Sequence, residues 1–287
     1  MNTIPTSSGE QACKIELRDV YKVFGNRAPE AVELLKQGAD KQAVQKQTDC
    51  IVGLAGVDAC FPAQQISCVM GLSGSGKSTL VRHINRLIDP SAGQVLVDGQ
   101  DILQLDMASL RQFRRYGISM VFQAFGLLPH LTVVENVAFG LEVRGDKRSQ
   151  AREQARLWLE RVGLQDYADN YPDELSGGMQ QRVGLARALA VDADILLMDE
   201  AFSALDPLIR YEMQDELLQL WEDTRFTVLF VTHSIPEAVR IGNRILLLSP
   251  HPGQVRAELN SDGLDQPDPA TGERLSDRIH RLLFAGE

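Results

Sequence analysis

A glycine-rich run in the first third of the chain has the composition of a phosphate-binding loop. Residues 71–78 read Gly-Leu-Ser-Gly-Ser-Gly-Lys-Ser and match the pattern G-x-x-x-x-G-K-[ST]. Glycines let backbone N–H groups curve around phosphate oxygens, and the start of a following helix adds partial positive charge. The Lys77 ammonium can reach nucleotide phosphates, and the Ser78 hydroxyl can bind Mg²⁺. The expected phosphate-binding residues are Gly71, Leu72, Ser73, Gly74, Ser75, Gly76, Lys77, Ser78 and Thr79.

Two adjacent carboxylates, Asp199 and Glu200, follow an apolar run in the second half of the chain. The run, residues 195–198, reads Ile-Leu-Leu-Met and is typical of a buried parallel strand. Acids directly after such a strand lie at the carboxyl edge of the sheet, where α/β proteins bind ligands. We expect Asp199 to help hold Mg²⁺ and Glu200 to polarise an attacking water. Taken alone, the pair would equally well cap the next loop, but the phosphate-binding pattern favours the catalytic interpretation.

A second glycine signature lies between these two motifs. Residues 175–182 read Leu-Ser-Gly-Gly-Met-Gln-Gln-Arg and precede an expected helix. Ser176 suits an N-cap, and Gly177 with Gly178 permits close backbone approach, so this helix start is also suited to an anion. One nucleotide needs only one phosphate-binding loop. We therefore expect the second site to serve the nucleotide of another copy of the chain, which predicts a homodimer.

The elements that position these residues follow from apolar patterning. An alternating strand is expected at 15–23, strands resume near Cys60, and buried runs predict strands at 66–70, 195–198, 227–231 and 244–248. Helices are expected at 78–88, 149–162, 179–189, 207–222 and 276–283. Asp206 and Pro207 suit the N-cap and first residue of the fourth helix. Strands that alternate with helices predict an α/β fold.

Three stretches depart from this alternation. Residues 28–50 predict two short polar helices, 31–36 and 41–47, with Gly38 ending the first and Asp40 capping the second. Residues 109–143 are expected to mix a short helix with loop, and residues 261–272 to form loop.

Composition limits the class of protein. The 287 residues carry 29 Lys and Arg against 39 Asp and Glu, a net charge of −10, which argues against a nucleic-acid binder. No apolar run approaches the roughly 20 residues of a membrane span, and residues 1–11 lack the apolar core of a secretory signal. The four cysteines form no CxxC pair and are expected to be reduced thiols. These features predict a soluble, acidic, cytoplasmic protein.

The ordered motifs resemble those of ABC-type ATPases, the nucleotide-binding subunits of transporters. Residues 175–182 resemble the family signature, Gln123 its Q-loop glutamine, residues 203–206 its D-loop, and His233 its switch histidine. Phe24 resembles the aromatic residue that stacks on adenine. The resemblance implies an α/β P-loop NTPase with a mixed sheet core, a helical subdomain and a small antiparallel β-subdomain.

The resemblance also implies roles. Two subunits would enclose two ATP molecules head-to-tail, with Glu200 as the base and His233 holding the γ-phosphate and the water. Mg²⁺ would contact Ser78, Gln123 and Asp199. The residues implied to reach the other copy's nucleotide are Ser176, Gly177 and Gly178, and Gln180 and Asp206 are also implied to bind the nucleotide. Without the motif set, Phe24 would be interpreted as core, His233 as structural and Gln123 as a loop amide. The remaining histidines, His83, His130, His251 and His280, are expected to be surface or structural.

The implied domain organisation is a disordered lead at 1–12, an ATPase domain at 13–250 and a short tail at 251–287. Within the ATPase domain we expect a helical insert at about 28–50 and a helical subdomain at about 108–185. The insert and the sequences at 20–25, 70–79, 85–90, 171–178 and 199–210 resemble those of importers of glycine betaine, proline and choline. Gln64 and Gln65 replace the usual Gly-Glu turn there, which we interpret as a surface change.

The importer resemblance implies partners as well. They are a membrane-spanning permease and a periplasmic or extracellular solute-binding protein, with this chain at the cytoplasmic face of the plasma membrane. The region from Gln123 to Arg144 would meet the permease, and Phe125, Leu127, Leu128 and Phe139 would form a groove or simply belong to the core.

The solute remains open at the level of sequence. The chain ends at Glu287 without room for the paired CBS-type sensor of many betaine relatives, and residues 248–255 resemble nitrate- and sulfonate-type importers. An importer of an amino acid such as histidine is therefore an alternative. A soluble ABC ATPase of DNA repair or translation would show tandem halves or a coiled-coil insert, which are not seen. Intact Glu200 and His233 argue against a regulatory module without turnover.

Overall fold

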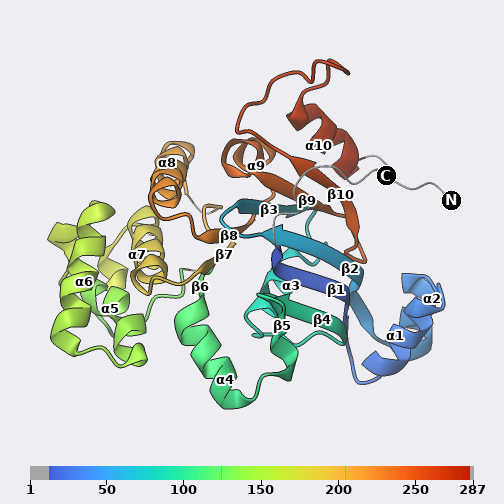
Figure 1. The fold of residues 1–287 in the computed structure, drawn as a ribbon, viewed down its shortest axis with the longest axis horizontal. Coiled ribbons are helices and arrows are strands. Elements are labelled where there is room, and N and C mark those ends of the chain that lie inside the picture. The colour runs from blue at the N-terminus through green and yellow to red at the C-terminus, as the bar shows by residue number, and fades with distance from the viewer. Residues whose placement is uncertain (1–12, 124, 204, 285–287) are drawn as a thin grey trace.

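The centre of the molecule is a six-stranded sheet with the order β10-β9-β3-β8-β7-β6 (Figure 1). The computed structural model describes residues 13–123, 125–203 and 205–284, so the lead expected at residues 1–12 lies outside the described residues. The strands are β3 (Ile66–Gly71), β6 (Ile118–Val121), β7 (Ile195–Asp199), β8 (Thr227–Val231), β9 (Arg244–Leu248) and β10 (Val255–Asn260). All pairings are parallel except that of β10 with β9, so the sheet is mixed.

A second, four-stranded antiparallel sheet has the order β2-β1-β4-β5. Its strands are β1 (Cys13–Phe24), β2 (Ile51–Pro62), β4 (Ala92–Val97) and β5 (Gln100–Asp101). Buried Ile15 and Leu54 from this sheet join Val69 of β3 and Leu80 in one apolar cluster, so the two sheets share a core. The strand expected at 15–23 is confirmed. The next strand begins at Ile51 rather than near Cys60. Gly53 and Gly56 interrupt its apolar alternation, which is why the pattern did not indicate its first half.

Five helices lie next to the two sheets (Figure 1). They are α3 (Lys77–Ile84), α4 (Met107–Gln112), α8 (Pro207–Thr224), α9 (Ile235–Ile241) and α10 (Leu275–Phe284). Asp206 caps α8 by accepting from the N–H groups of Leu208 and Ile209, as expected. Helix α3, expected to extend to residue 88, ends at Ile84. Arg86 has a φ of 55°, which a right-handed helix excludes.

Three further helices form a bundle beside the sheet: α5 (Val133–Arg144), α6 (Arg148–Arg161) and α7 (Gly177–Ala190). Val137, Ala155, Leu159 and Val183 belong to their common apolar cluster. The expectation of short helix and loop at 109–143 was incomplete: α4 is the short helix, but the stretch also contains β6 and most of α5. Helix α5 begins at a capping box of Thr132 with Glu135 and ends at Gly145, which has a left-handed conformation.

The insert predicted between 28 and 50 is a pair of helices, α1 (Ala28–Lys36) and α2 (Lys41–Thr48). Asp40 caps α2, with 2.7 Å between the Ala43 nitrogen and the Asp40 carboxylate. The pair has an apolar cluster of its own, in which buried Ala31 and Val44 meet β-strand residue Val52. It lies at one end of the antiparallel sheet (Figure 1).

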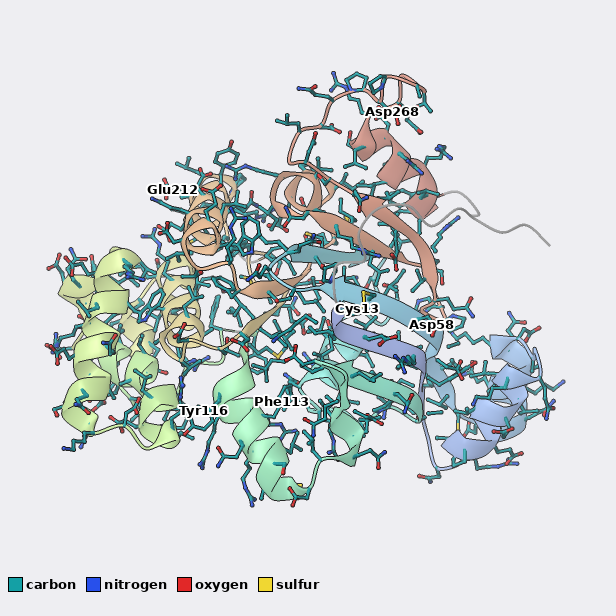
Figure 2. All side chains as sticks on the ribbon, viewed as in Figure 1. Cys13, Asp58, Phe113, Tyr116, Glu212 and Asp268 are labelled. Atoms are coloured by element: carbon teal, nitrogen blue, oxygen red, sulfur yellow. A yellow bond between two sulfur atoms is a disulfide. The ribbon has the colours of Figure 1, made fainter. Side chains whose placement is uncertain are left out.

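The cysteines differ from the expectation of four reduced thiols. Cys13 (labelled in Figure 2) forms a disulfide with Cys60, with 5.6 Å between their Cα atoms. Cys50 and Cys68 are free and buried. The antiparallel pairing of β1 with β2 brings the two bonded residues together across 47 positions, which spacing alone does not reveal. None of the helices in the described part of the chain is both long and apolar enough to cross a bilayer.

The remaining regular segments are short turns. The 3-10 turns are Ile102–Gln104, Gln165–Tyr167 and Pro172–Glu174, and a π-helical turn spans Phe113–Gly117.

Candidate nucleotide-binding site

The glycine-rich loop joins the fully buried strand β3 to the start of α3. Gly74 and Gly76 have φ of 77° and 85°, in the left-handed region that favours glycine. A Cβ on Gly76 would lie 3.0 Å from the Gly53 carbonyl oxygen, so β2 packs directly on the loop. The sequence thus produces a curved, glycine-rich backbone at a helix start, which is a site for phosphate.

Lys77 is folded back over this loop. Its ammonium donates to the carbonyl oxygens of Gly71 at 2.9 Å and Leu72 at 3.1 Å, and its side chain is 6% exposed. Burial lowers the pKa of Lys77, and the carboxylates of Glu200 and Asp199 act in the opposite direction. The ammonium therefore lies in a partly desolvated position where an anion of higher charge would bind it strongly.

The Ser78 hydroxyl and the Asp199 carboxylate lie next to each other, and both are oxygen ligands of the kind that Mg²⁺ binds. The Ser78 hydroxyl donates to the Asp199 carboxylate at 2.7 Å, and the Arg82 guanidinium donates to the other carboxylate oxygen at 3.1 Å. No group of three or more His, Cys, Asp or Glu side chains suited to a metal occurs among the described residues. Mg²⁺ is commonly held by one or two protein oxygens together with substrate phosphates, so this small donor set beside the loop fits it.

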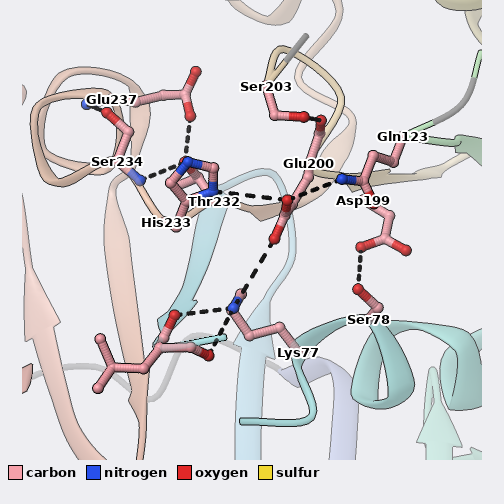
Figure 3. A network of polar contacts seen from close by, with 12 residues as sticks. Lys77, Ser78, Gln123, Asp199, Glu200, Ser203, Thr232, His233, Ser234 and Glu237 are labelled. Atoms are coloured by element: carbon pink, nitrogen blue, oxygen red, sulfur yellow. Dashed lines mark hydrogen bonds and ion pairs between the residues drawn. The ribbon is translucent and has the colours of Figure 1, made fainter. Parts of the chain in front are cut away.

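Glu200 occupies the centre of a polar network (Figure 3). Its carboxylate accepts from the Gln123 amide at 3.3 Å and lies 3.7 Å from the His233 Nδ1 and 4.0 Å from the Lys77 ammonium. Its φ of 48° is unusual for a residue with a Cβ, and its N–H is held by the Val231 carbonyl at 3.1 Å.

The three network residues lie just beyond the carboxyl ends of neighbouring strands. Gln123 follows β6, Glu200 follows β7, and His233 follows β8. Parallel pairing brings these ends to one edge of the sheet, as expected for the carboxylate pair. A basic carboxylate, an amide and an exposed imidazole next to a phosphate loop can orient a water for attack on phosphorus.

A cavity of about 750 Å³ connects the loop with this network. Phe24 lines this cavity and is 43% exposed, so its ring is accessible to a base, while the Lys22 ammonium lies 5.1 Å from the ring centroid. The predicted residues that line it are Phe24, Ser73, Gly74, Gly76, Lys77, Ser78, Thr79, Gln123, Glu200 and His233.

Five residues that the sequence did not suggest also line this cavity. They are Lys41 of α2, His251 of the tail, and Ile51, Val52 and Gly53 of β2. The His251 ring lies against Gly74, where a Cβ would come within 2.4 Å of its Cε1. Backbone hydrogen bonds of 3.0 Å from the Gly253 N–H to Gly53 and from the Ala55 N–H to Gly253 fix the tail there. No local pattern marks His251, because the residues it meets lie more than a hundred positions away.

The signature residues are not part of this cavity. Ser176 caps α7, with 3.3 Å from the Met179 nitrogen to its hydroxyl. Gln180 turns back and donates to the carbonyl oxygens of Pro172 and Leu175 at 2.9 and 3.2 Å. Asp206 is engaged as the cap of α8. Ser176, Gly177, Gly178, Gln180 and Asp206 are thus away from the chain's own phosphate loop.

Comparison with known proteins gives a consistent result. The sequence model of the ABC transporter family matches residues 54–203, just over half of the chain. The chain is 52% identical over 237 residues to the glycine betaine/proline betaine transport ATP-binding protein ProV of Escherichia coli, covering 83% of this chain and 59% of ProV. It is 47% identical over 234 residues to the trimethylamine N-oxide transport ATP-binding protein TmoW of Pelagibacter ubique, covering 82% and 68%. The chain thus spans about three fifths of the length of ProV.

A solved structure supports the same assignment. The chain superposes on the ATP-binding cassette MJ0796, a dimer bound to ADP and Pi, with a TM-score of 0.73 at 32% identity, covering 87% of this chain and 100% of that one. The mixed sheet, the helical bundle and the antiparallel sheet expected from the resemblance are all present. On the family match and these relatives, the chain belongs to the ABC transporter family and has the fold of its ATP-binding cassettes.

Proposed function

We propose that the chain is the ATP-hydrolysing subunit of an importer for a quaternary amine such as glycine betaine or proline betaine. The observation that carries the hydrolytic part is the Glu200 carboxylate, held by Gln123 and next to both His233 and Lys77. A nucleotide-binding module without turnover has no need of this arrangement. The named functions of ProV and TmoW support the class of solute.

In this proposal each residue has one task. Phe24 stacks on adenine, and the loop N–H groups of residues 71–79 with the Lys77 ammonium bind the phosphates. Ser78, Asp199 and Gln123 would hold Mg²⁺, which supplies charge neutralisation at the β- and γ-phosphates. Glu200 accepts the proton of the attacking water, and His233 holds the water and the terminal phosphate in line.

The signature residues complete the site of a second copy. Exposed Gly177 and half-buried Gly178 form a helix start suited to an anion, yet they lie outside their own chain's cavity. A head-to-tail homodimer would place this helix start and Asp206 on the nucleotide of the partner. The MJ0796 cassette, to which the chain is similar, is dimeric.

An apolar hollow near Gln123 supports contact with a permease. A cavity of about 390 Å³ is lined by Leu128 and Phe139, together with Phe122 and Val143. Phe139 and Val143 are 43% and 42% exposed, which is unusual for large apolar side chains. Of the four residues expected here, Leu127 instead packs on the core of the helical bundle, and Phe125 is not among the lining residues. We propose that a cytoplasmic segment of a permease occupies this hollow.

The remaining partners and the location follow from the same proposal. A solute-binding protein delivers the solute outside the cell, and the chain acts at the cytoplasmic face of the plasma membrane without binding nucleic acid. An amino-acid importer is the second candidate for the solute, because the methionine import ATP-binding protein MetN of Caulobacter vibrioides is 45% identical to the chain over 195 residues.

The decisive experiment reconstitutes the chain with its permease and binding protein in vesicles. ATP hydrolysis is measured with glycine betaine, proline, choline, trimethylamine N-oxide and histidine in turn, and Glu200→Gln serves as the inactive control. We expect stimulation by glycine betaine. Stimulation by histidine alone would transfer the chain to the amino-acid class. Hydrolysis that no solute stimulates would favour a soluble ABC ATPase instead.

A further inference from the structure

A buried polar cluster supports the loop that carries His233. At its centre is Glu237 of α9, whose side chain is almost completely buried. Its two carboxylate oxygens accept hydrogen bonds from the Thr232 hydroxyl and from the Gln214 amide, the latter at 2.9 Å. Figure 3 shows Glu237 directed at Thr232, on the other side of the loop from Glu200. The three side chains come from α9, the end of β8 and α8.

Within the described residues, no basic group forms an ion pair with Glu237. The nearby Arg240 guanidinium binds the Gln214 carbonyl oxygen at 2.8 Å and Asp215 at 2.6 Å instead. A buried carboxylate that lacks a direct counter-charge is costly unless neutral donors satisfy it. Gln214 therefore bridges the two groups. Its amide N–H donates to Glu237, and its carbonyl oxygen accepts from the Arg240 guanidinium.

Thr232 connects this carboxylate to the backbone on both sides of His233. Its hydroxyl donates to Glu237 and accepts from the Ser234 N–H at 2.9 Å, and its own N–H is bound to Val69 of β3 at 3.2 Å. The residues before and after His233 are thus fixed while the imidazole itself stays exposed. The imidazole is the group that lies 3.7 Å from Glu200.

We propose that Glu237 is a positioning residue for His233. Through the Thr232 hydroxyl it fixes the backbone that carries the imidazole, and through Gln214 it ties that backbone to α8, the helix that Asp206 caps. The inference rests on the proposed ATP hydrolysis, because it assigns Glu237 a role in the geometry of that reaction. Since Glu237 also lies in the first turn of α9, a role limited to holding that helix is the competing explanation.

The first test uses two substitutions of Thr232 in the full chain. Thr232→Val keeps the shape and removes the hydroxyl, whereas Thr232→Ser keeps the hydroxyl. A misplaced imidazole slows the chemical step, so we expect Thr232→Val to lower kcat by about tenfold or more, with the KM and equilibrium affinity for ATP unchanged. Thr232→Ser should restore most of kcat. An unchanged kcat in Thr232→Val, or a loss of ATP affinity equal to the loss of kcat, would overturn the proposal.

The second test reverses the hydrogen bond between α8 and α9. In Glu237→Gln, the introduced side chain has one acceptor oxygen, so it cannot accept from both Thr232 and Gln214 as the carboxylate does. The double variant Gln214→Glu/Glu237→Gln exchanges the two groups. The amide introduced on α9 then donates to the carboxylate introduced on α8, and that carboxylate pairs with Arg240. The oxygen of the introduced amide still accepts from Thr232.

The two variants are expected to differ in kcat. We expect the double variant to have a higher kcat than Glu237→Gln alone, because the exchange restores a donor and an acceptor between the two helices. Losses that simply add would contradict the coupling.

Controls separate the failure of this proposal from that of the proposed function. Glu222→Gln removes an exposed carboxylate from the same helix α8 and should keep the wild-type kcat. If the wild-type chain binds ATP without hydrolysing it, the proposed function fails. If the wild type hydrolyses ATP and Thr232→Val matches it, only the role of Glu237 fails. Should Glu237→Gln not fold, the Thr232 pair still decides.

Discussion

The position of Glu200 is set by its backbone as much as by its neighbours. Its left-handed φ turns the chain sharply after β7, and the bond from its N–H to Val231 holds that turn against β8. Non-glycine residues in this region carry strain of about 1 kcal/mol or more, which only a well-determined surrounding maintains. The result is a carboxylate aimed between Gln123, His233 and Lys77.

Replacement of Glu200 tests its role as the base. Glu200→Gln keeps the shape and the hydrogen-bond reach of the side chain but cannot accept a proton. We expect kcat to fall by about 100-fold or more, as for loss of a general base, while ATP binding persists and the ATP-bound dimer accumulates. Single-turnover hydrolysis and gel filtration with ATP measure the two effects. A wild-type rate would remove Glu200 from the catalytic step.

His251 gives a second prediction for a single residue. Because its ring packs on Gly74 and lines the cavity, His251→Ala should open the wall beside the phosphate loop. We expect a several-fold higher KM for ATP with little change in kcat. The matched control is His130→Ala, at an exposed histidine remote from the cavity lining, which should behave as wild type. Equal KM values for the two variants would show that the His251 ring does not contribute to binding.

Contiguous residues were predictable and scattered ones were not. The phosphate loop, Asp199 and Glu200 each follow an apolar strand and precede a helix or loop. Both the type of side chain and its flanking elements can therefore be read from the local sequence. Lys41 and His251 line the cavity only because the fold places α2 and the tail next to the phosphate loop. Glu237 is an acid in an ordinary helix start until the fold places Thr232 and Gln214 beside it.

At the scale of elements, the end of α3 shows how burial creates a pH response. His83 in its last turn is fully buried; one ring nitrogen contacts the Ile88 carbonyl oxygen at 2.6 Å, and the other has no partner in the structure. Burial lowers the pKa of His83 below its usual 6.5, against the opposing effect of the Ile88 carbonyl. The folded chain therefore keeps this imidazole neutral at a pH where the unfolded chain would protonate it.

This difference predicts the sign of an acid effect. Below pH 6.5 the unfolded state binds the proton more readily, so the free energy of unfolding should fall as the pH decreases from 6.5 toward the lower folded-state pKa. His83→Gln, which keeps a donor for Ile88 but does not titrate, should show a flatter decline between about pH 7 and pH 5 in urea unfolding. His130→Gln is the exposed control and should follow the wild type. Parallel curves for all three proteins would contradict the assignment.

Elements with one dominant pattern were predictable from sequence. The buried runs of β3, β7 and β8 and the capped helices α2 and α8 were found because one residue pattern determined each. β6, α5 and β10 were missed for different reasons. β6 has only four residues, α5 is rich in valine and carries apolar residues around most of its circumference, and β10 depends on pairing with β9. In these three cases tertiary contacts outweigh local preference.

For the whole molecule, the separation of the signature from the phosphate loop predicts shared sites. In a head-to-tail dimer, each nucleotide needs Lys77 of one copy and Gly178 of the other. Lys77→Ala should remove the first contribution. Gly178→Asp should remove the second by placing negative charge where a phosphate binds, at a helix start that tolerates an acid.

Mixed dimers distinguish this arrangement from sites made within one copy. A mixture of Lys77→Ala chains with Gly178→Asp chains should recover hydrolysis, because one of the two shared sites contains neither change. Chains that carry both changes, mixed with wild type, should form mixed dimers in which both sites are damaged. Sites made within one copy would give the reverse result: no recovery in the first mixture and an intact wild-type site in the second. Steady-state phosphate release at fixed total protein measures both.

The disulfide between Cys13 and Cys60 and the burial of Cys50 and Cys68 have a practical consequence. No described cysteine presents a free thiol to solvent, so a cysteine introduced on the surface would react with maleimide dyes almost alone. Asp223 is an exposed residue near the end of α8, and the neighbouring Thr224 lines a hollow together with Asp194, which precedes β7. This end of the sheet is opposite the edge that carries Glu200. A fluorophore on Asp223→Cys would therefore report on the motion of the cassette from a place that leaves its chemistry undisturbed.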